Sequence, residues 1–388
     1  MNGSTAAPVT LTEQESVAQS LASGTAGEAL LAVERAFTGT TDWRTAQQLI
    51  TQAAAGRVNA AEHAGLYYGA PAIAFVLHRT RADGRDRYAT VRGSLDEYVR
   101  RLTRRRLRSA VERVRTGVPA SFTEYDLFSG LTGLGAMLLH DQPGSDELYG
   151  VLRYLIRLTE PRQVHGITIP GWWVSHHPDR LLPTPGGHAN FGMAHGAAGF
   201  LALLANASVR GIQVDGQQEA IIRLCAWYDL WQQDSPAGPW WPQWLTRDQL
   251  RAGRPGPGPG RPSWCYGAAG IGRALQLAGL ATGDQECRST GEAAIASCLT
   301  DQQMDHLTEP GICHGLAGLY QTALRAAGDA ANPTIRHRLP ALAERLAAAA
   351  PAPSNAFLTG STGVALVAET IRTGKPPQTR WDACLLIT

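Results

Sequence analysis

Two cysteines and one histidine of the chain are residues of the types that bind zinc. Cys265 lies in the segment SWCYGAAG, and the adjacent Cys313 and His314 lie in ICHGLAG. Zinc favours thiolate and imidazole ligands, and a catalytic zinc site uses three protein ligands and keeps a fourth position open. A single cysteine is more often a buried core residue, but here both occur at the same place before a glycine. The pattern therefore predicts one Zn²⁺ ion bound by Cys265, Cys313 and His314.

These two motifs belong to a set of six similar segments. Each has a glycine, small residues, usually a second glycine three positions on, and then an apolar run with helical period. The segments are LYYGAPAIAFVL, DLFSGLTGLGAMLL, MAHGAAGFLALL, WCYGAAGIGRAL, ICHGLAGLYQTAL and FLTGSTGVALVAE, with leading glycines Gly69, Gly130, Gly196, Gly267, Gly315 and Gly360. Glycine costs about 1 kcal/mol in a helix interior, so the repeated pairs need a structural reason. We expect them to let neighbouring helices approach closely at their N-terminal ends.

The repeats also predict the architecture. Amphipathic segments such as 94–118 and 339–349 alternate with the glycine-led segments. This alternation indicates an all-α protein built as an α/α toroid, with the repeat helices lining the inside of the ring. An open superhelical solenoid is the alternative, which the glycine pairs alone do not exclude.

Two stretches depart from the helical pattern. The segment QVHGITIPGWWV, at 163–174, contains β-branched residues suited to short strands, and residues 253–262 form a loop rich in proline and glycine. We expect a single toroid domain over residues 1–388, with a β-containing extension inserted at approximately 141–190.

Composition excludes several classes of protein. The 388 residues contain 35 Lys and Arg against 33 Asp and Glu, a formal net charge of +2 that gives no support to a nucleic-acid-binding role. The six cysteines include no CxxC pair, so a disulfide framework is not expected. No apolar run approaches the roughly 18 residues of a spanning helix, and no secretory signal is evident. We therefore expect a cytoplasmic protein that is not an integral membrane protein.

The segments AHGAAG, SWCYGAAG and ICHGLAG, in this order and at these spacings, closely resemble the lanthionine synthetase C family, the zinc-dependent cyclases of lanthipeptide biosynthesis. The resemblance extends from about Leu66 to Val367, and YDLFSG and PGWWV match further family patterns. The family fold is an α/α toroid, which favours the ring over the solenoid. Only six of the family's seven inner helices show the glycine pattern here, so a seventh copy is expected to have lost it.

The resemblance implies a role for each residue of the candidate site. Zinc binding is carried over to the three ligands already named. Four further residues are placed around the reacting centre: Asp126, His195, Arg261 and Tyr266. The implied reaction is the addition of cysteine thiols to dehydroalanine or dehydrobutyrine in a dehydrated precursor peptide, which forms lanthionine and methyllanthionine rings.

The chemistry of this addition suggests how the four residues divide the work. Negative charge develops on an amide oxygen, and the guanidinium of Arg261 stays charged in any site. His195 can deliver a proton to the α-carbon, with Asp126 to orient it. Asp126 can alternatively serve only as a helix N-cap, His195 as a hydrogen-bonded core residue, and Tyr266 as a packing residue.

Other functions fit parts of the same pattern. A related enzyme could add glutathione or another thiol to dehydroamino acids, and a non-catalytic zinc-stabilised scaffold could bind peptides within a biosynthetic complex. A protein prenyltransferase β-subunit is also a zinc toroid, but it needs a carboxylate ligand and a partner subunit.

The expected partners follow from the cyclase reaction. They are the dehydrated precursor peptide with its leader, and a dehydratase and transporter in a membrane-associated complex to which this protein would be peripheral. The arginine-rich helix at 100–108 could meet an acidic leader, although such a run is more often a solvated face.

Overall fold

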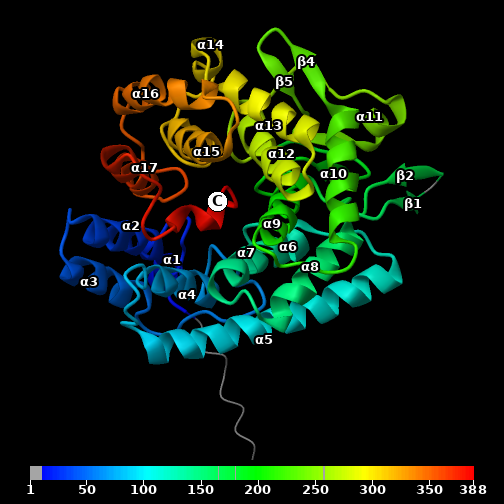
Figure 1. The fold of residues 1–388 in the computed structure, drawn as a ribbon. Helices are drawn as coiled ribbons and strands as arrows, with labels where there is room; N and C mark the ends of the chain where they lie inside the picture. Colours follow the sequence, from blue (N-terminus) through cyan, green and yellow to red (C-terminus); the bar gives the residue numbers. More distant parts are fainter. Residues whose placement is uncertain (1–10, 165, 180, 257) are drawn as a thin grey trace, which may run out of the picture.

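The computed structural model describes residues 11–164, 166–179, 181–256 and 258–388, and within them seven helices form a closed ring (Figure 1). The ring helices are α2 (Thr25–Thr38), α4 (Ala70–Arg79), α7 (Leu131–Asp141), α9 (Ala197–Val209), α12 (Ala268–Thr282), α15 (Leu316–Asp329) and α17 (Ser361–Thr373). Each helix contacts the next, and α17 contacts α2, so the ring closes on itself. The predicted all-α toroid is confirmed.

A second layer of helices covers the outside of the ring. The outer helices are α3 (Trp43–Ala53), α5 (Ala89–Thr116), α8 (Asp146–Leu158), α10 (Gln217–Trp231), α13 (Gln285–Cys298) and α16 (Thr334–Ala347). The inner helix α9 is buried along almost its whole length, whereas α8 buries one stripe that includes Leu148, Leu152 and Leu155. This difference is expected because an inner helix has neighbours on all sides and an outer helix has one covered face.

Shorter helices and strands complete the chain. The helices are α1 (Glu13–Ala18), α6 (Phe122–Tyr125), α11 (Arg247–Ala252), α14 (Asp301–Met304) and the 3₁₀ helix η1 (Trp381–Leu385). Antiparallel pairs join β1 (Arg162–Val164) to β2 (Ile167–Ile169), β3 (His188–Asn190) to β6 (Trp244–Thr246), and β4 (Gln233–Ser235) to β5 (Gly238–Trp240). The predicted extension at 141–190 thus contains β1–β3 together with α8, and three strands lie outside it. None of the helices in the described part of the chain combines the length and the apolar composition that a membrane span requires.

The paired glycines are explained by two kinds of contact, one of which was expected. A Cβ at Gly199, the second glycine of its pair, would lie 2.5 Å from the carbonyl oxygen of Met193, six residues earlier in the same turn. The backbone thus folds back on its own helix start, and only glycine fits. The expected approach of neighbouring repeats is also present, since a Cβ at Gly270 would lie 3.3 Å from the Cβ of Met193 and one at Gly363 would lie 2.8 Å from Ile312. The expectation did not include the tighter contact within each repeat.

The turns before the inner helices are joined by backbone hydrogen bonds around the ring. Ala194 N–H donates to Cys265 O (3.2 Å), Cys265 N–H donates to Cys313 O (3.2 Å), and Cys313 N–H donates to Leu358 O (2.8 Å). Leu358 N–H then donates to Ala22 O (3.1 Å), which links the last repeat to the first. Each of these residues lies two positions before the leading glycine of its repeat. Equivalent positions are therefore neighbours at one end of the ring.

A seventh repeat is present at α2, and it retains the glycine pair. Gly24 is the N-cap of α2, and Gly27 follows three positions on. A Cβ at Gly27 would lie 2.6 Å from Leu21 O and 2.9 Å from the Cβ of Phe357 in the last repeat. The prediction that a seventh copy had lost its glycines was wrong, because the segment SGTAGEAL carries the same spacing.

Gly27→Ala should destabilise the protein by about 2–3 kcal/mol, because the added methyl group meets both Leu21 O in its own turn and Phe357 of the last repeat. Chemical denaturation measures the effect. Gly328→Ala is the matched control, since Gly328 lies in α15 and an added Cβ there meets nothing within 4 Å. The control should stabilise the helix by about 0.5–1 kcal/mol. Equal stability of the two variants would contradict this explanation of the ring closure.

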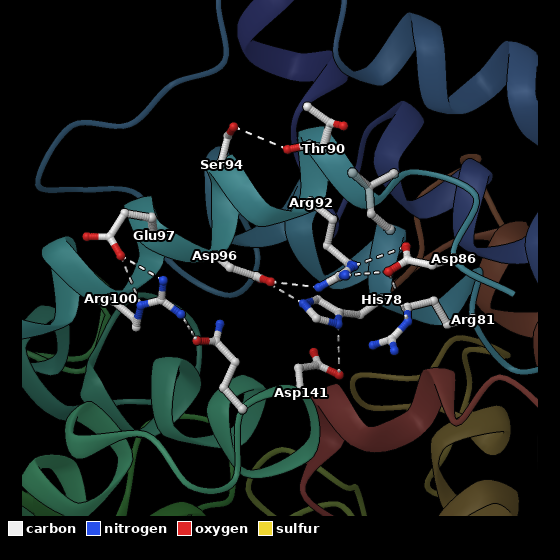
Figure 2. A network of polar contacts seen from close by, with 12 residues as sticks. His78, Arg81, Asp86, Thr90, Arg92, Ser94, Asp96, Glu97, Arg100 and Asp141 are labelled. Atoms are coloured by element: carbon white, nitrogen blue, oxygen red, sulfur yellow. Dashed lines mark hydrogen bonds and ion pairs between the residues drawn. The ribbon is translucent and has the colours of Figure 1, made fainter. Parts of the chain in front are cut away.

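A network of polar contacts joins the C-terminal ends of α4 and α7 (Figure 2). His78 Nε2 lies 2.7 Å from Asp96 Oδ1 of α5, and His78 Nδ1 lies 3.7 Å from Asp141 Oδ1 of α7. Asp96 also pairs with Arg92 (2.9 Å), and Asp141 pairs with Arg79. This buried network joins an inner helix to its outer helix and to its ring neighbour.

The C-terminal segment lies at the centre of the ring (Figure 1). Trp264 Nε1 donates to Leu385 O (3.0 Å), and the Tyr67 hydroxyl donates to Cys384 O (2.8 Å). Asp382 is fully buried and pairs with Arg325 of α15 at 2.7 Å. The segment therefore lies along the axis of the ring. Its carbonyl groups accept hydrogen bonds from Tyr67 and Trp264, in the turns that precede α4 and α12.

Candidate metal centre and active site

The three predicted zinc ligands lie together in the turns before α12 and α15. The ligand atoms of Cys265, Cys313 and His314 all lie within 4.8 Å of one another. The backbone hydrogen bond from Cys265 to Cys313 sets the two cysteines side by side, since both hold the same position of the repeat. The fold thus places two sulfur atoms and one imidazole nitrogen at one point of the ring.

The electrostatics of this cluster favour a thiolate. Hydrogen bonds from the Cys313 thiol and from His314 hold the pKa of Cys265 well below its usual range, although burial opposes the shift. The same contact with Cys265 raises the pKa of His314. Thiolate and imidazole donors at this spacing fit a zinc ion, and they do not fit magnesium or calcium, which prefer oxygen.

A carboxylate outside the sequence motifs orients the histidine of the cluster. Glu309 Oε2 lies 2.9 Å from His314 Nε2, which leaves the other ring nitrogen available for a metal. Carboxylate partners of this kind fix the ring orientation of a histidine ligand and raise its basicity. Sequence reasoning missed Glu309, because it lies outside the repeat positions. Ser263 was also missed; its hydroxyl lies 3.5 Å from Cys265 Sγ.

Asp126 and His195 form a second pair of functional groups. Asp126 Oδ2 lies 2.7 Å from His195 Nδ1, and the aspartate side chain is 3% exposed. Its other oxygen, Oδ1, accepts the N–H groups of Ser129 (2.7 Å) and Gly130 (2.9 Å) at the start of α7. The alternative that Asp126 serves only as the N-cap of α7 is wrong, because the N-cap is Gly130 and no side chain caps it. The carboxylate instead holds the turn before α7 through one oxygen and His195 through the other.

Aromatic rings fix the plane of the His195 side chain. Phe122 and Phe128 each stack on the imidazole with ring centroids 5.0 Å away. The Tyr125 hydroxyl donates to the His195 carbonyl oxygen at 3.2 Å. The His195 side chain remains 29% exposed, and its Nε2 has no hydrogen-bond partner among the described residues. This nitrogen is therefore free to meet a substrate, unlike that of a core histidine whose bonds are all made.

Tyr266 and Arg261 lie close to these groups. The Tyr266 ring centroid is 6.0 Å from that of His195. Burial raises the pKa of Tyr266, and the nearby cysteines and Asp126 raise it further, so the phenol keeps its proton at neutral pH. Arg261 Nη1 lies 3.9 Å from Glu309 Oε1, and half of the arginine side chain is exposed. All seven predicted site residues thus gather at the end of the ring where the inner helices begin.

A known protein family matches almost the whole chain, including the residues of this site. The model of the lanthionine synthetase C-like proteins matches residues 15–386. The chain belongs to the lanthionine synthetase C-like family. As a family member, it is 25% identical over 263 residues to the nisin biosynthesis protein NisC of Lactococcus lactis subsp. lactis. This alignment covers 66% of the chain and 60% of that relative, less than two thirds of its length.

A solved structure shows the same fold as this lanthionine synthetase C-like protein. The structure of nisin cyclase superposes on this chain with a TM-score of 0.79, and the superposition covers 97% of this chain and 93% of the nisin cyclase chain. Sequence identity in this comparison is 21%, so the likeness establishes the toroid and not the chemistry.

Proposed function

We propose that this protein is a lanthipeptide cyclase, which adds cysteine thiols of a dehydrated precursor peptide to dehydroalanine or dehydrobutyrine in the same peptide. The products are lanthionine and methyllanthionine thioether rings. The observation that carries the proposal is the convergence of a thiolate and imidazole cluster with the Asp126–His195 pair at one end of a closed ring. Membership of the lanthionine synthetase C-like family supports it.

The residues that would hold one zinc ion are Cys265, Cys313 and His314. A bound zinc ion favours the thiolate form of a thiol that it ligates, so it would supply a nucleophile at neutral pH. Glu309 would hold the His314 ring in place for this purpose.

The remaining residues would handle charge and protons. When sulfur bonds to the β-carbon, the electron pair of the carbon–carbon double bond moves towards the carbonyl, and negative charge collects on the amide oxygen. Arg261 would stabilise that charge, because a guanidinium is permanently cationic and half of this one is exposed. His195 would then donate a proton from Nε2 to the α-carbon, while Asp126 stabilises the imidazolium through Nδ1. Tyr266 is a neutral second donor beside them.

The decisive experiment counts thiols. The zinc-loaded protein is incubated with a dehydrated, cysteine-containing precursor peptide. Free thiols are then alkylated, and the mass of the peptide is measured by mass spectrometry. Each ring should remove one alkylation site without changing the mass of the unalkylated peptide. Glutathione in a parallel sample tests the thiol-adding alternative, since its addition would increase the peptide mass. An unchanged thiol count with intact, zinc-loaded protein would overturn the cyclase proposal.

Glu309→Gln should weaken zinc affinity by about 10–100-fold, the usual cost of losing a partner that orients a ligand. The amide keeps the size of the side chain but loses the negative charge next to His314. Competition with a chromogenic zinc chelator measures the affinity. Glu344→Gln, at an exposed position of α16, is the control and should bind zinc as the parent does. Equal affinity for both variants would remove Glu309 from the metal centre.

The proposed substrate also defines the proposed partners. A dehydratase must act first, because the double bonds that the thiols attack have to be made from hydroxyl side chains. We propose a cytoplasmic setting and an association with that enzyme and a transporter. The arginine-rich helix α5 gives little support for leader binding, because Arg100, Arg104 and Arg105 already lie in ion pairs with acidic residues.

A further inference from the structure

Two cysteines outside the candidate site touch one another on the outer layer of the ring. Cys225 lies on α10 and Cys287 lies on α13, and the Cys287 thiol donates a hydrogen bond to Cys225 Sγ at 3.2 Å. Both residues are partly exposed, and both line a surface hollow of about 240 Å³. Solvent and small reagents therefore have access to this pair of thiols.

The pair differs from the other cysteines of the chain. Cys298 and Cys384 are buried singly, without another thiol beside them. The pKa of Cys287 is raised by its hydrogen bond to Cys225 and by burial, so the pair differs from these two in exposure and adjacency and not in acidity. Cys265 and Cys313 belong to the metal centre. Cys225 and Cys287 are thus the two thiols that are accessible, adjacent to one another and free of any role in the proposed reaction.

The distance between the two sulfurs is close to that of a covalent link. A disulfide needs an S–S separation of about 2.05 Å, so the sulfurs must approach by roughly 1.2 Å from their present 3.2 Å. Rotations of the two side chains and small shifts of two outer helices can supply a movement of this size. No rearrangement of the inner ring is required, because neither residue lies on an inner helix.

We propose that Cys225 and Cys287 form an oxidisable dithiol that closes to an intramolecular disulfide when the protein meets hydrogen peroxide. The Cys225 thiolate attacks one peroxide oxygen and becomes a sulfenic acid, and the other oxygen leaves as water after protonation. The Cys287 sulfur then attacks the sulfenic sulfur, and a second water leaves. The two thiols lose two electrons, which reduce the peroxide, and a dithiol reductant reverses the change.

The link would tie together two helices that flank the helix next to the metal centre. Both α10 and α13 contact α12, which begins three residues after Cys265. The disulfide closes a loop between positions 62 residues apart, and this loop contains Arg261 and Cys265. Constraining such a loop in the unfolded chain should raise the thermal midpoint by several degrees.

The test uses the full-length, zinc-loaded protein and does not depend on the cyclase proposal. The protein is titrated with hydrogen peroxide at doses that leave its zinc content unchanged, alkylated, digested without reductant and analysed by mass spectrometry. We expect one linked pair of peptides carrying Cys225 and Cys287, lighter by two hydrogens, together with a higher thermal midpoint. Dithiothreitol should restore both alkylation sites and the original midpoint.

Matched variants separate this pair from general oxidation. Cys225→Ser and Cys287→Ser should each abolish the link and the rise in midpoint, whereas Cys298→Ser should keep both. Circular dichroism establishes that the variants are folded. Separate oxidation of the two cysteines to sulfinic acids, or continued separate alkylation of both, would overturn the proposal. A link between either cysteine and any other residue would overturn it as well.

Discussion

Cys313→Ala should abolish stoichiometric zinc binding and reduce cyclisation by more than the roughly 100-fold that loss of an orienting partner costs. The substitution removes one of the two proposed thiol ligands and leaves only the Cys265 sulfur and the His314 ring at the candidate site. It also removes the hydrogen bond that holds the pKa of Cys265 low, so the remaining thiol is a poorer ligand at neutral pH. Elemental analysis of the purified protein gives the zinc content, and thiol counting gives the activity.

The control for this variant is Cys298→Ala. Cys298 is buried on α13, and its thiol donates to the carbonyl oxygen of Ala294 in the same helix, so its loss removes a thiol outside the candidate metal centre. It should retain one zinc per chain and full activity, with a modest loss of stability from the small cavity. Full zinc content in Cys313→Ala would show that the metal binds elsewhere and would remove the basis of the proposed chemistry.

The adjacency of the proposed zinc ligands was predictable from the register of the repeats. Cys265 and Cys313 each lie two positions before a leading glycine, and in a closed ring of helices equivalent positions become neighbours. His195 lies one position before its own leading glycine in the preceding repeat, and this explains why it faces the same end of the ring. The repeats thus predicted an all-α fold and a shared location for these residues, whereas the choice of a ring over a solenoid came from the family resemblance.

Residues outside this register could not be predicted in the same way. Glu309 approaches His314 because the loop before α15 folds back, and no spacing rule in the sequence encodes that contact. The pairing of β3 with β6 joins segments more than fifty residues apart, and three-residue strands carry too little pattern to pair from sequence. The glycine pair of α2 is a different case, since Gly24 and Gly27 have the expected spacing and were overlooked.

His195→Asn should keep one zinc per chain but slow cyclisation by about 10²–10⁴-fold, the range expected when a positioned proton donor is lost. Zinc binding should survive because His195 contacts Asp126 and two phenylalanine rings and none of the proposed ligands. Proton delivery to the α-carbon should then fall to solvent, so the configuration at that carbon should become mixed. Chiral analysis of the hydrolysed rings measures this outcome, and unchanged rate and configuration would exclude His195 as the donor.

Two substitutions of Asp126 distinguish a chemical from a structural cause of slower cyclisation. Asp126→Asn keeps an oxygen that can accept the N–H groups of Ser129 and Gly130, so the turn before α7 should keep its hydrogen bonds, but it removes the charge that stabilises an imidazolium. Asp126→Ala removes both the acceptor and the charge, and should also cost about 1–3 kcal/mol of stability because two N–H groups of that turn lose their partner. If the asparagine variant is as stable as the parent yet as slow as His195→Asn, the defect lies in proton transfer. If only the alanine variant is slow, Asp126 supports the reaction by holding the turn before α7 in place. His195 would then donate its proton without a negatively charged partner.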